Sequence, residues 1–114
     1  MIKIEFTTND KTGRLSLKVK GHANQNDIGK DIVCASASIL AYTVAQVVSN
    51  IESKGGLKKI PTIKLSKGNA VITCHPTEEY KDELAHTYYV AEVGYALLAH
   101  NYPQYVDFNS FGKA

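Results

Sequence analysis

Cysteine is scarce in this sequence, which holds only Cys34 and Cys74 among its 114 residues. At most one disulfide can form between them, and two free thiols are the default expectation. A secretory signal is also lacking, because Met1–Thr7 already alternates like a strand and carries charges. No apolar run approaches the length of a membrane span. We therefore expect a cytoplasmic protein without a membrane partner.

A strong excess of charge is absent as well. The 13 basic and 11 acidic residues leave a net charge of +2, which is too balanced for a nucleic-acid footprint. No direct nucleic-acid partner is expected, and the charge sets no strong constraint on a substrate. A hydrophobic content of 44% and a charged content of 21% are typical of a soluble globular protein. Residues 1–114 are long enough for one core, so we expect a single domain.

Alternating apolar and polar residues predict two hairpins and a last short strand. Ile2–Phe6 and Leu15–Val19 alternate on either side of a polar turn cluster and predict the first hairpin. Pro61 starts a second hairpin, whose later strand, at 70–73, is apolar enough to lie inside a sheet. Residues 105–108 suggest a short strand at the end.

Two longer segments show helical spacing. The first runs from about Ile32 to Ser53 and the second from an N-cap at Thr77 to about His100. The apolar stripe of the first segment is Ala37, Leu40, Ala41, Val44, Val47, Val48 and Ile51. The apolar stripe of the second is Tyr80, Leu84, Tyr88, Ala91, Tyr95 and Leu98. The tyrosines of the second stripe suggest a face that is only partly buried, as at a subunit interface.

The order strand, strand, helix, strand, strand, helix, strand predicts an α+β fold of two layers. We expect a mixed or antiparallel sheet of about five strands with two long helices against it.

The stretch from Gly21 to Ser38 holds the residues best suited to chemistry. It passes from the end of a strand through a small, polar loop to the start of the first helix, with His22 near its beginning and Cys34 near its end. A thiolate is a nucleophile, and a nearby imidazole or the positive end of a helix lowers the pKa of a thiol. A Cys/His dyad is therefore one interpretation of the stretch.

Asp31 and Ser38 have two interpretations each. Asp31 is an N-cap candidate that would place Cys34 at the third helical position, near unpaired backbone N–H groups; otherwise it orients His22. Ser38 lies one turn after Cys34, where it bonds the thiol or lines the pocket floor, or else bonds back to a helix carbonyl.

Structural interpretations compete with the dyad. A lone cysteine beside alanine and valine is commonly a small buried hydrophobe, and a lone histidine at a strand end is commonly an ordinary surface residue. Cys74 and His75 could join His22 and Cys34 in a zinc site, but neither pair has finger-like spacing, so no metal is expected. His86 is expected to face solvent, and His100 lies in the last turn of its helix.

The stretch resembles the signature of the ribosomal-processing cysteine protease family (Prp). The residues that carry the resemblance are Gly21-His22-Ala23, Gly29, Asp31-Ile32-Val33-Cys34-Ala35 and Ser38. The resemblance implies that His22 and Cys34 are the catalytic pair. Gly21, Asp31 and Ser38 are the candidate supporting residues, and no cofactor is expected. It also implies a cysteine endopeptidase that removes the N-terminal extension of a precursor ribosomal protein of the bacterial large subunit. A homodimer is implied in the same way.

The resulting hypothesis has Cys34 attack a carbonyl with His22 as base, while backbone N–H groups near Cys34 form an oxyanion hole. Residues 23–30 would form a mobile cover. The alternative is a non-catalytic ribosome-associated binding module, in which Cys34 is merely small and buried.

Overall fold

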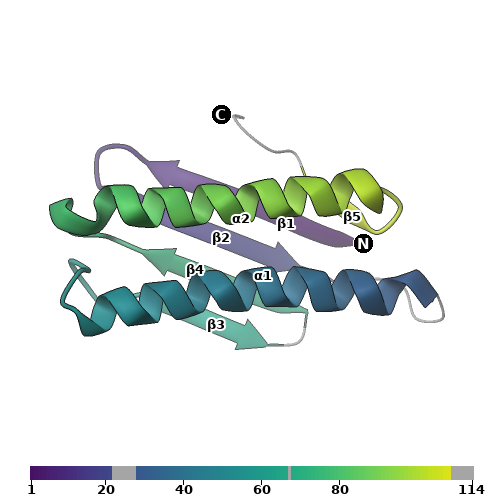
Figure 1. Cartoon of the computed structure of the whole chain (residues 1–114), viewed down its shortest axis with the longest axis horizontal. Coiled ribbons are helices and arrows are strands. Elements are labelled where there is room, and N and C mark those ends of the chain that lie inside the picture. The colour runs from purple at the N-terminus through teal and green to yellow at the C-terminus, as the bar shows by residue number, and fades with distance from the viewer. Residues whose placement is uncertain (22–27, 67, 109–114) are drawn as a thin grey trace.

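The computed structural model describes residues 1–21, 28–66 and 68–108, apart from the side chains of 28–31. Within these residues the chain forms a five-stranded sheet, two long helices and a short 3₁₀ helix. In chain order the elements are β1 (Ile2–Asn9), β2 (Arg14–Lys20), α1 (Ile28–Ser53), β3 (Thr62–Ser66), β4 (Asn69–Cys74), η1 (Glu78–Tyr80), α2 (Lys81–Asn101) and β5 (Val106–Phe108). Both long helices lie side by side over one face of the sheet (Figure 1). The predicted α+β fold of two layers is confirmed.

The first hairpin forms as its alternating pattern predicts. β1 and β2 pair antiparallel, with Ile4 opposite Val19, and their apolar side chains share the face below the helices. The turn between them is held by Asn9, whose side-chain oxygen accepts from the N–H groups of Lys11 and Thr12 at 2.9 and 3.1 Å.

The strand order is β3-β4-β2-β1-β5, so β4 is an interior strand, as predicted. β4 pairs antiparallel with both β2 and β3, whereas β5 pairs parallel with β1 and makes the sheet mixed. Because the hairpin of β3 and β4 joins the sheet through β4, β3 is left at one edge.

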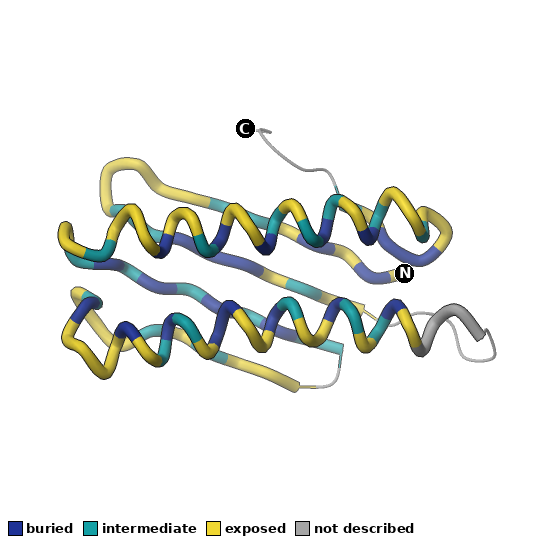
Figure 2. The backbone as a smooth tube through the Cα atoms, in the orientation of Figure 1, coloured by how far each residue is buried: buried dark blue, intermediate teal, exposed yellow. Residues whose placement is uncertain are grey.

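The two helices run antiparallel and lie over different strands of the sheet (Figure 1). α1 packs on β4 and β2, and α2 packs on β5 and β2. Buried positions recur about once per turn along both helices (Figure 2). Most of the first predicted stripe is buried, while Leu40 and Val47 are only partly covered. The second stripe is buried from Leu84 to Leu98.

The prediction that the tyrosines of α2 lie on a partly exposed face is wrong. Tyr88 is 4% exposed and Tyr95 is fully buried. Their hydroxyl groups donate to the backbone carbonyls of Ile72 and Ala37 at 3.0 and 2.7 Å. Because each hydroxyl finds a partner inside the protein, the rings can be core residues despite their polar ends.

α1 begins at Ile28, one turn earlier than the sequence predicted. Asp31 is therefore the fourth residue of the helix and is not its N-cap. Residues 28–31 include Gly29 and carry no helical apolar period, so pattern analysis assigned them to the loop. A helix already formed from Ile32 onward extends easily by another turn, because propagation costs far less than nucleation. Residues 28–30 of the predicted cover therefore belong to α1, and residues 23–27 lie outside the described residues.

The start of the second helical segment also differs from the prediction in its capping and in its first turn. Thr77 occupies the N-cap position of η1 but makes no capping hydrogen bond through its side chain. η1 occupies the first turn, and α2 follows from Lys81. The acidic residues Glu78 and Glu79 lie in this turn, where the helix dipole favours negative charge.

The expectation that no segment has the length and polarity of a membrane span is also wrong. Ile32–Ser53 of α1 passes that test with 22 residues. A core helix of a soluble protein passes the same test, and the buried side of α1 belongs to the core formed with the sheet.

Candidate functional site

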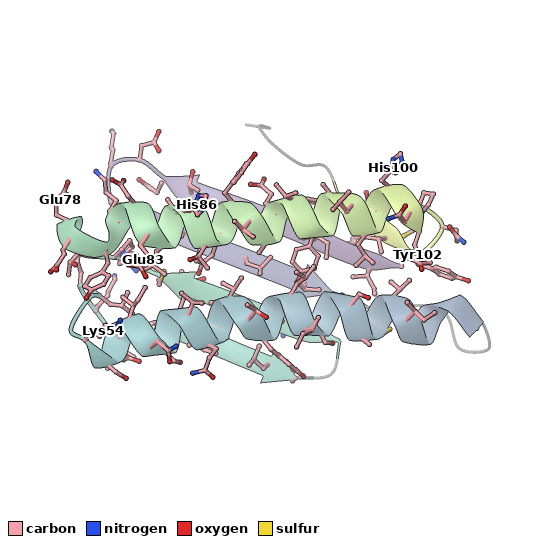
Figure 3. All side chains as sticks on the ribbon, in the orientation of Figure 1. Lys54, Glu78, Glu83, His86, His100 and Tyr102 are labelled. Atoms are coloured by element: carbon pink, nitrogen blue, oxygen red, sulfur yellow. The ribbon has the colours of Figure 1, made fainter. Side chains whose placement is uncertain are left out.

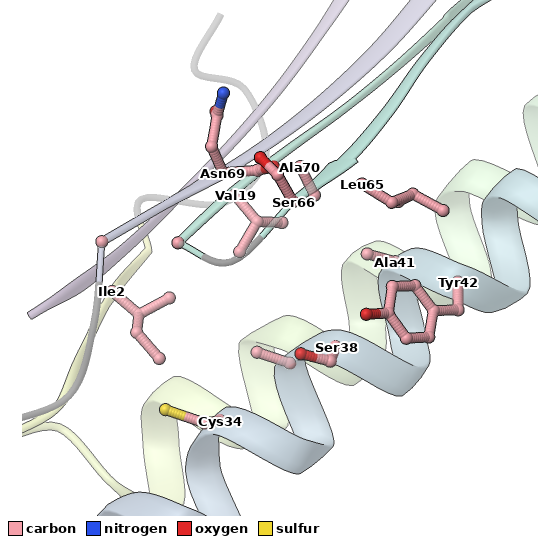
Figure 4. Close-up of a pocket in the computed structure, with 13 residues that line it drawn as sticks. Ile2, Val19, Cys34, Ser38, Ala41, Tyr42, Leu65, Ser66, Asn69 and Ala70 are labelled. Atoms are coloured by element: carbon pink, nitrogen blue, oxygen red, sulfur yellow. The ribbon is translucent and has the colours of Figure 1, made fainter.

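Three of the five predicted site residues line one cavity. Cys34 and Ser38 reach it from α1 (Figure 4), and Gly21, the residue after β2, also lines it. His22 lies outside the described residues, as does the side chain of Asp31. The structure therefore brings together Gly21, Cys34 and Ser38 and leaves the His22–Cys34 pairing as a prediction.

The cavity lies between α1 and the ends of several strands and has a volume of about 300 Å³. Small side chains keep its floor open, because Ala37 and Ala41 of α1 face Ala70 of β4 across it. Its lining is completed by Ile2 of β1, Val19 of β2, Tyr42 of α1, and four residues of the second hairpin: Leu65, Ser66, Gly68 and Asn69.

Cys34 is the cysteine with access to this cavity. It is partly buried against the core and also lines the open space. Among the described residues its thiol has no hydrogen-bond partner. A partly exposed thiol at the wall of a cavity can be reached by a substrate carbonyl, whereas a sealed thiol cannot.

Gly21 fixes the point at which the chain leaves β2. Its φ of +103° is one that residues with a side chain rarely adopt. A Cβ atom at this position would collide with the backbone carbonyl oxygen of Met1. Its N–H group donates to the carbonyl of Gly68 at 3.0 Å. The residue before His22 is thus held tightly against the cavity wall.

The expected oxyanion hole at the start of α1 does not fit this structure. With α1 beginning at Ile28, Cys34 is the seventh helical residue and not the third. At that position its backbone N–H belongs to the regular i→i−4 ladder, because only the first turn leaves N–H groups unpaired. Ser38 is exposed on the next turn, so its hydroxyl is a polar group of α1 that lines the cavity one turn from the thiol.

Cys74 has the opposite environment. It is fully buried at the far end of β4, opposite Leu15, four residues and about 13 Å along the strand from Ala70 at the cavity. Burial raises the pKa of its thiol, and the hydroxyl of Tyr88 donates to its sulfur at 3.7 Å. Both cysteines are free thiols. A zinc site shared by Cys34 and Cys74 is excluded by this separation.

The other three histidines do not line the Cys34 cavity. His86 is exposed on α2, as expected, and His100 lies in the last turn of that helix, also as expected (Figure 3). His75 lies beyond the end of β4 at the Cys74 end, and slight burial with the nearby charges of Lys59, Arg14 and Lys58 lowers its pKa.

Sequence analysis missed two residues at the cavity mouth. Tyr42 is 51% exposed and Leu65 is 42% exposed, although both are large and apolar. They come from α1 and β3 and lie on opposite sides of the opening (Figure 4). Tyr42 stands off the apolar stripe of α1, which was the available signal, but its pairing with Leu65 depends on tertiary structure.

A family model described as "Cysteine protease Prp" matches residues 1–107. No curated protein sequence matches the chain.

Solved structures share the fold. The ribosomal processing protease Prp from S. aureus in complex with a substrate peptide has a TM-score of 0.69 at 21% identity, covering 96% of this chain and 98% of that one. The same protease with a covalently linked product peptide has a TM-score of 0.67 at 22% identity with the same coverage. SMU.848 from Streptococcus mutans has a TM-score of 0.64 at 24% identity, covering 96% of this chain and 92% of that one.

Proposed function

Because the chain belongs to the cysteine protease Prp family, and is thus a cysteine protease, we propose that Cys34 is its nucleophile and His22 its general base. The observation that carries this proposal is the contrast between the two thiols. Cys34 lines an open cavity, whereas Cys74 is sealed in the core and hydrogen-bonded by Tyr88. The binding-module alternative gives no reason for a cavity at the partly exposed cysteine of a protease family.

The position of Gly21 supports the role of His22. Gly21 lines the same cavity as Cys34, donates a hydrogen bond to Gly68, and lies so close to the backbone of Met1 that a Cβ atom would not fit. His22 directly follows Gly21 in the sequence. We therefore propose that its imidazole acts in the space in front of the Cys34 thiol.

The proposed reaction proceeds in two steps. The Cys34 sulfur attacks the scissile carbonyl while His22 accepts the thiol proton, and His22 then gives that proton to the leaving amine as the C–N bond breaks. This leaves the acyl group on Cys34 as a thioester. Water attacks the thioester with His22 again as base, and the proton returns to the sulfur as the carboxylic product leaves.

Ser38 is proposed to donate a hydrogen bond to the substrate in this cavity. Its hydroxyl group lies one turn after Cys34 on the same helix, so both groups meet a substrate from the same side. A donor aimed at the developing oxyanion stabilises the transition state more than the ground state.

The proposed substrate is the precursor of a bacterial large-subunit ribosomal protein, from which the enzyme removes the N-terminal extension. Its support is the family and the shared fold with the S. aureus ribosomal processing protease that was solved with a substrate peptide. A homodimer in the cytoplasm is proposed on the same basis, and light scattering of the purified protein measures its mass.

Intact-mass analysis of the precursor ribosomal protein tests the proposal. The wild-type protein should remove the N-terminal extension, whereas Cys34→Ser and His22→Ala should leave the precursor whole while keeping the circular dichroism of the wild type. Cleavage by Cys34→Ser would remove Cys34 from the mechanism. An uncleaved precursor together with a reactive Cys34 would reject this substrate.

A further inference from the structure

A second hollow lies next to the Cys34 cavity along the same helix. That hollow is lined by Tyr42, Ala45, Gln46, Ser49, Ile63 and Leu65. Tyr42 and Leu65 line both spaces, so we treat the two adjacent hollows as one groove between α1 and β3. Ser49 is fifteen residues after Cys34, which corresponds to about 22 Å along a helix. We call this space the α1–β3 groove.

The outer wall of the α1–β3 groove is an edge strand. Among the described residues β3 is the last strand on its side of the sheet, and α1 packs mainly on β4 and β2. Alternate residues of an edge strand direct their N–H and C=O groups away from the sheet, with no neighbouring strand to receive them. An extended peptide can complete this pairing by adding a strand.

We propose that the α1–β3 groove binds the substrate segment preceding the scissile bond as an added strand beside β3. This inference rests on the proposed function, because it places the scissile carbonyl at Cys34. β3 runs toward the Cys34 end of α1 (Figure 1). A segment whose carboxyl end reaches Cys34 therefore runs parallel to β3. At about 3.3 Å per residue, the groove holds roughly six or seven extended residues.

The groove also predicts the side chains of this segment. In an added strand, successive side chains point alternately to the two faces of the sheet. One set enters the groove between Tyr42 and Leu65, which are both exposed apolar residues. The other set emerges on the face that carries Lys64, where the sheet has no helix cover. The preferred segment therefore has apolar residues at every second position.

An N-terminal extension suits the groove better than a folded partner or a second copy of this chain. The groove leads directly to the proposed nucleophile, so an occupant with its carboxyl end there is placed for cleavage. A second copy paired through β3 would cover the mouth marked by Tyr42 and Leu65. Such pairing is the competing outcome in the test below.

Peptides of graded length test the length of the groove. Peptides with two, four and six residues before the scissile bond, and an unchanged segment after it, are compared by kcat/KM. We expect kcat/KM to rise with each lengthening. Ser49→Arg, at the far end of the groove, should cancel the gain of the longest peptide and leave the shortest unaffected. Thr43→Arg, on the exposed surface of α1 outside both hollows, is the matched control.

N-methylation of single peptide nitrogens tests strand addition. Methylation removes one N–H donor without changing a side chain, so alternate positions should lose about three- to tenfold in kcat/KM and intervening positions much less. An equal effect at every position, or no length dependence in the wild type, would overturn the inference.

Binding to the Cys34→Ser protein separates this inference from the proposed function. Fluorescence anisotropy should show the same alternation in Kd, even if the wild type cleaves none of the peptides. If the wild type cleaves the peptides but Kd does not alternate with the methylated position, the proposed protease function stands and strand addition is wrong. If Leu65→Lys dissociates a dimer and leaves peptide binding intact, β3 pairs with a second copy and the inference is wrong.

Discussion

A single glycine determines where the chain leaves β2 for His22. Gly21 combines a positive φ with a close approach to the carbonyl of Met1, and it contributes to the wall of the Cys34 cavity. Both features depend on the absence of a side chain. The role of this residue is therefore to place the backbone, and under the proposed mechanism its effect on catalysis would act through His22, the residue that follows.

The substitution Gly21→Ala tests this role. It should lower the free energy of unfolding by about 2 to 4 kcal/mol, because it adds the collision with Met1 to the cost of a left-handed backbone. Chemical denaturation measures the change, and kcat/KM should fall with it.

Gly13→Ala is the matched control. Gly13 has a φ of +77°, but a Cβ atom there meets nothing within 4 Å. Gly13→Ala should lower the free energy of unfolding by about 1 kcal/mol, because alanine is less stable than glycine in the left-handed backbone conformation. It should leave kcat/KM unchanged. Equal losses at the two glycines would show that the Met1 contact is unimportant.

At the scale of elements, α1 both closes the core and forms the floor of the site. Its small residues Ala37 and Ala41 line the cavity, while larger residues further along the helix fill the space between the helix and the sheet. Where a helix presents alanine beside a nucleophile, the unfilled volume becomes available to a substrate.

The substitution Ala41→Leu should fill this volume. We expect kcat/KM to fall at least tenfold, while Tm changes by only a few degrees, because the longer side chain extends into the cavity rather than into packed atoms. Ala35→Leu, at an exposed position outside the cavity lining, should leave both quantities unchanged. Unchanged kcat/KM for Ala41→Leu would place the substrate elsewhere.

The elements themselves could largely be predicted from the sequence. Alternation identified β1 and β2, an apolar run identified β4, and helical spacing identified the buried stripes, because these patterns follow from local backbone geometry and burial. The first turn of α1 was missed because residues around Gly29 carry no apolar period. Tyr88 and Tyr95 were misjudged because their carbonyl partners, on Ile72 and Ala37, are distant in sequence.

The candidate site could be predicted only in part. Cys34, Gly21 and Ser38 lie close together in the sequence, and the structure places all three at one cavity. Its far wall comes from Ile2 and from β3 and β4, which sheet pairing brings there. The exposed pair Tyr42 and Leu65 therefore appears only when the fold is known.

At the scale of the whole molecule, the core holds three acidic groups in their neutral forms. Burial raises the pKa values of Cys74, Tyr88 and Tyr95. In the unfolded chain a thiol ionises near pH 9 and a phenol near pH 10. Above those values the unfolded state loses protons that the folded state keeps, so stability falls as pH rises.

Denaturation between pH 8 and pH 11 under reducing conditions measures this effect. The free energy of unfolding should begin to fall near pH 9, by up to about 1.4 kcal/mol per pH unit for each group. Tyr95→Phe removes one group and should make the decline shallower above pH 10. A flat profile across this range would contradict the buried positions of these groups.

The central claim is that Cys34 is the reactive thiol of a cysteine protease, and its alkylation tests that claim most directly. The native protein is treated with iodoacetamide near neutral pH, and peptide mapping follows each cysteine while cleavage of the precursor is assayed in parallel. We predict that Cys34 is modified first, that activity disappears in proportion, and that Cys74 reacts only after unfolding. Full activity with Cys34 completely alkylated, or faster reaction at Cys74, would contradict the account.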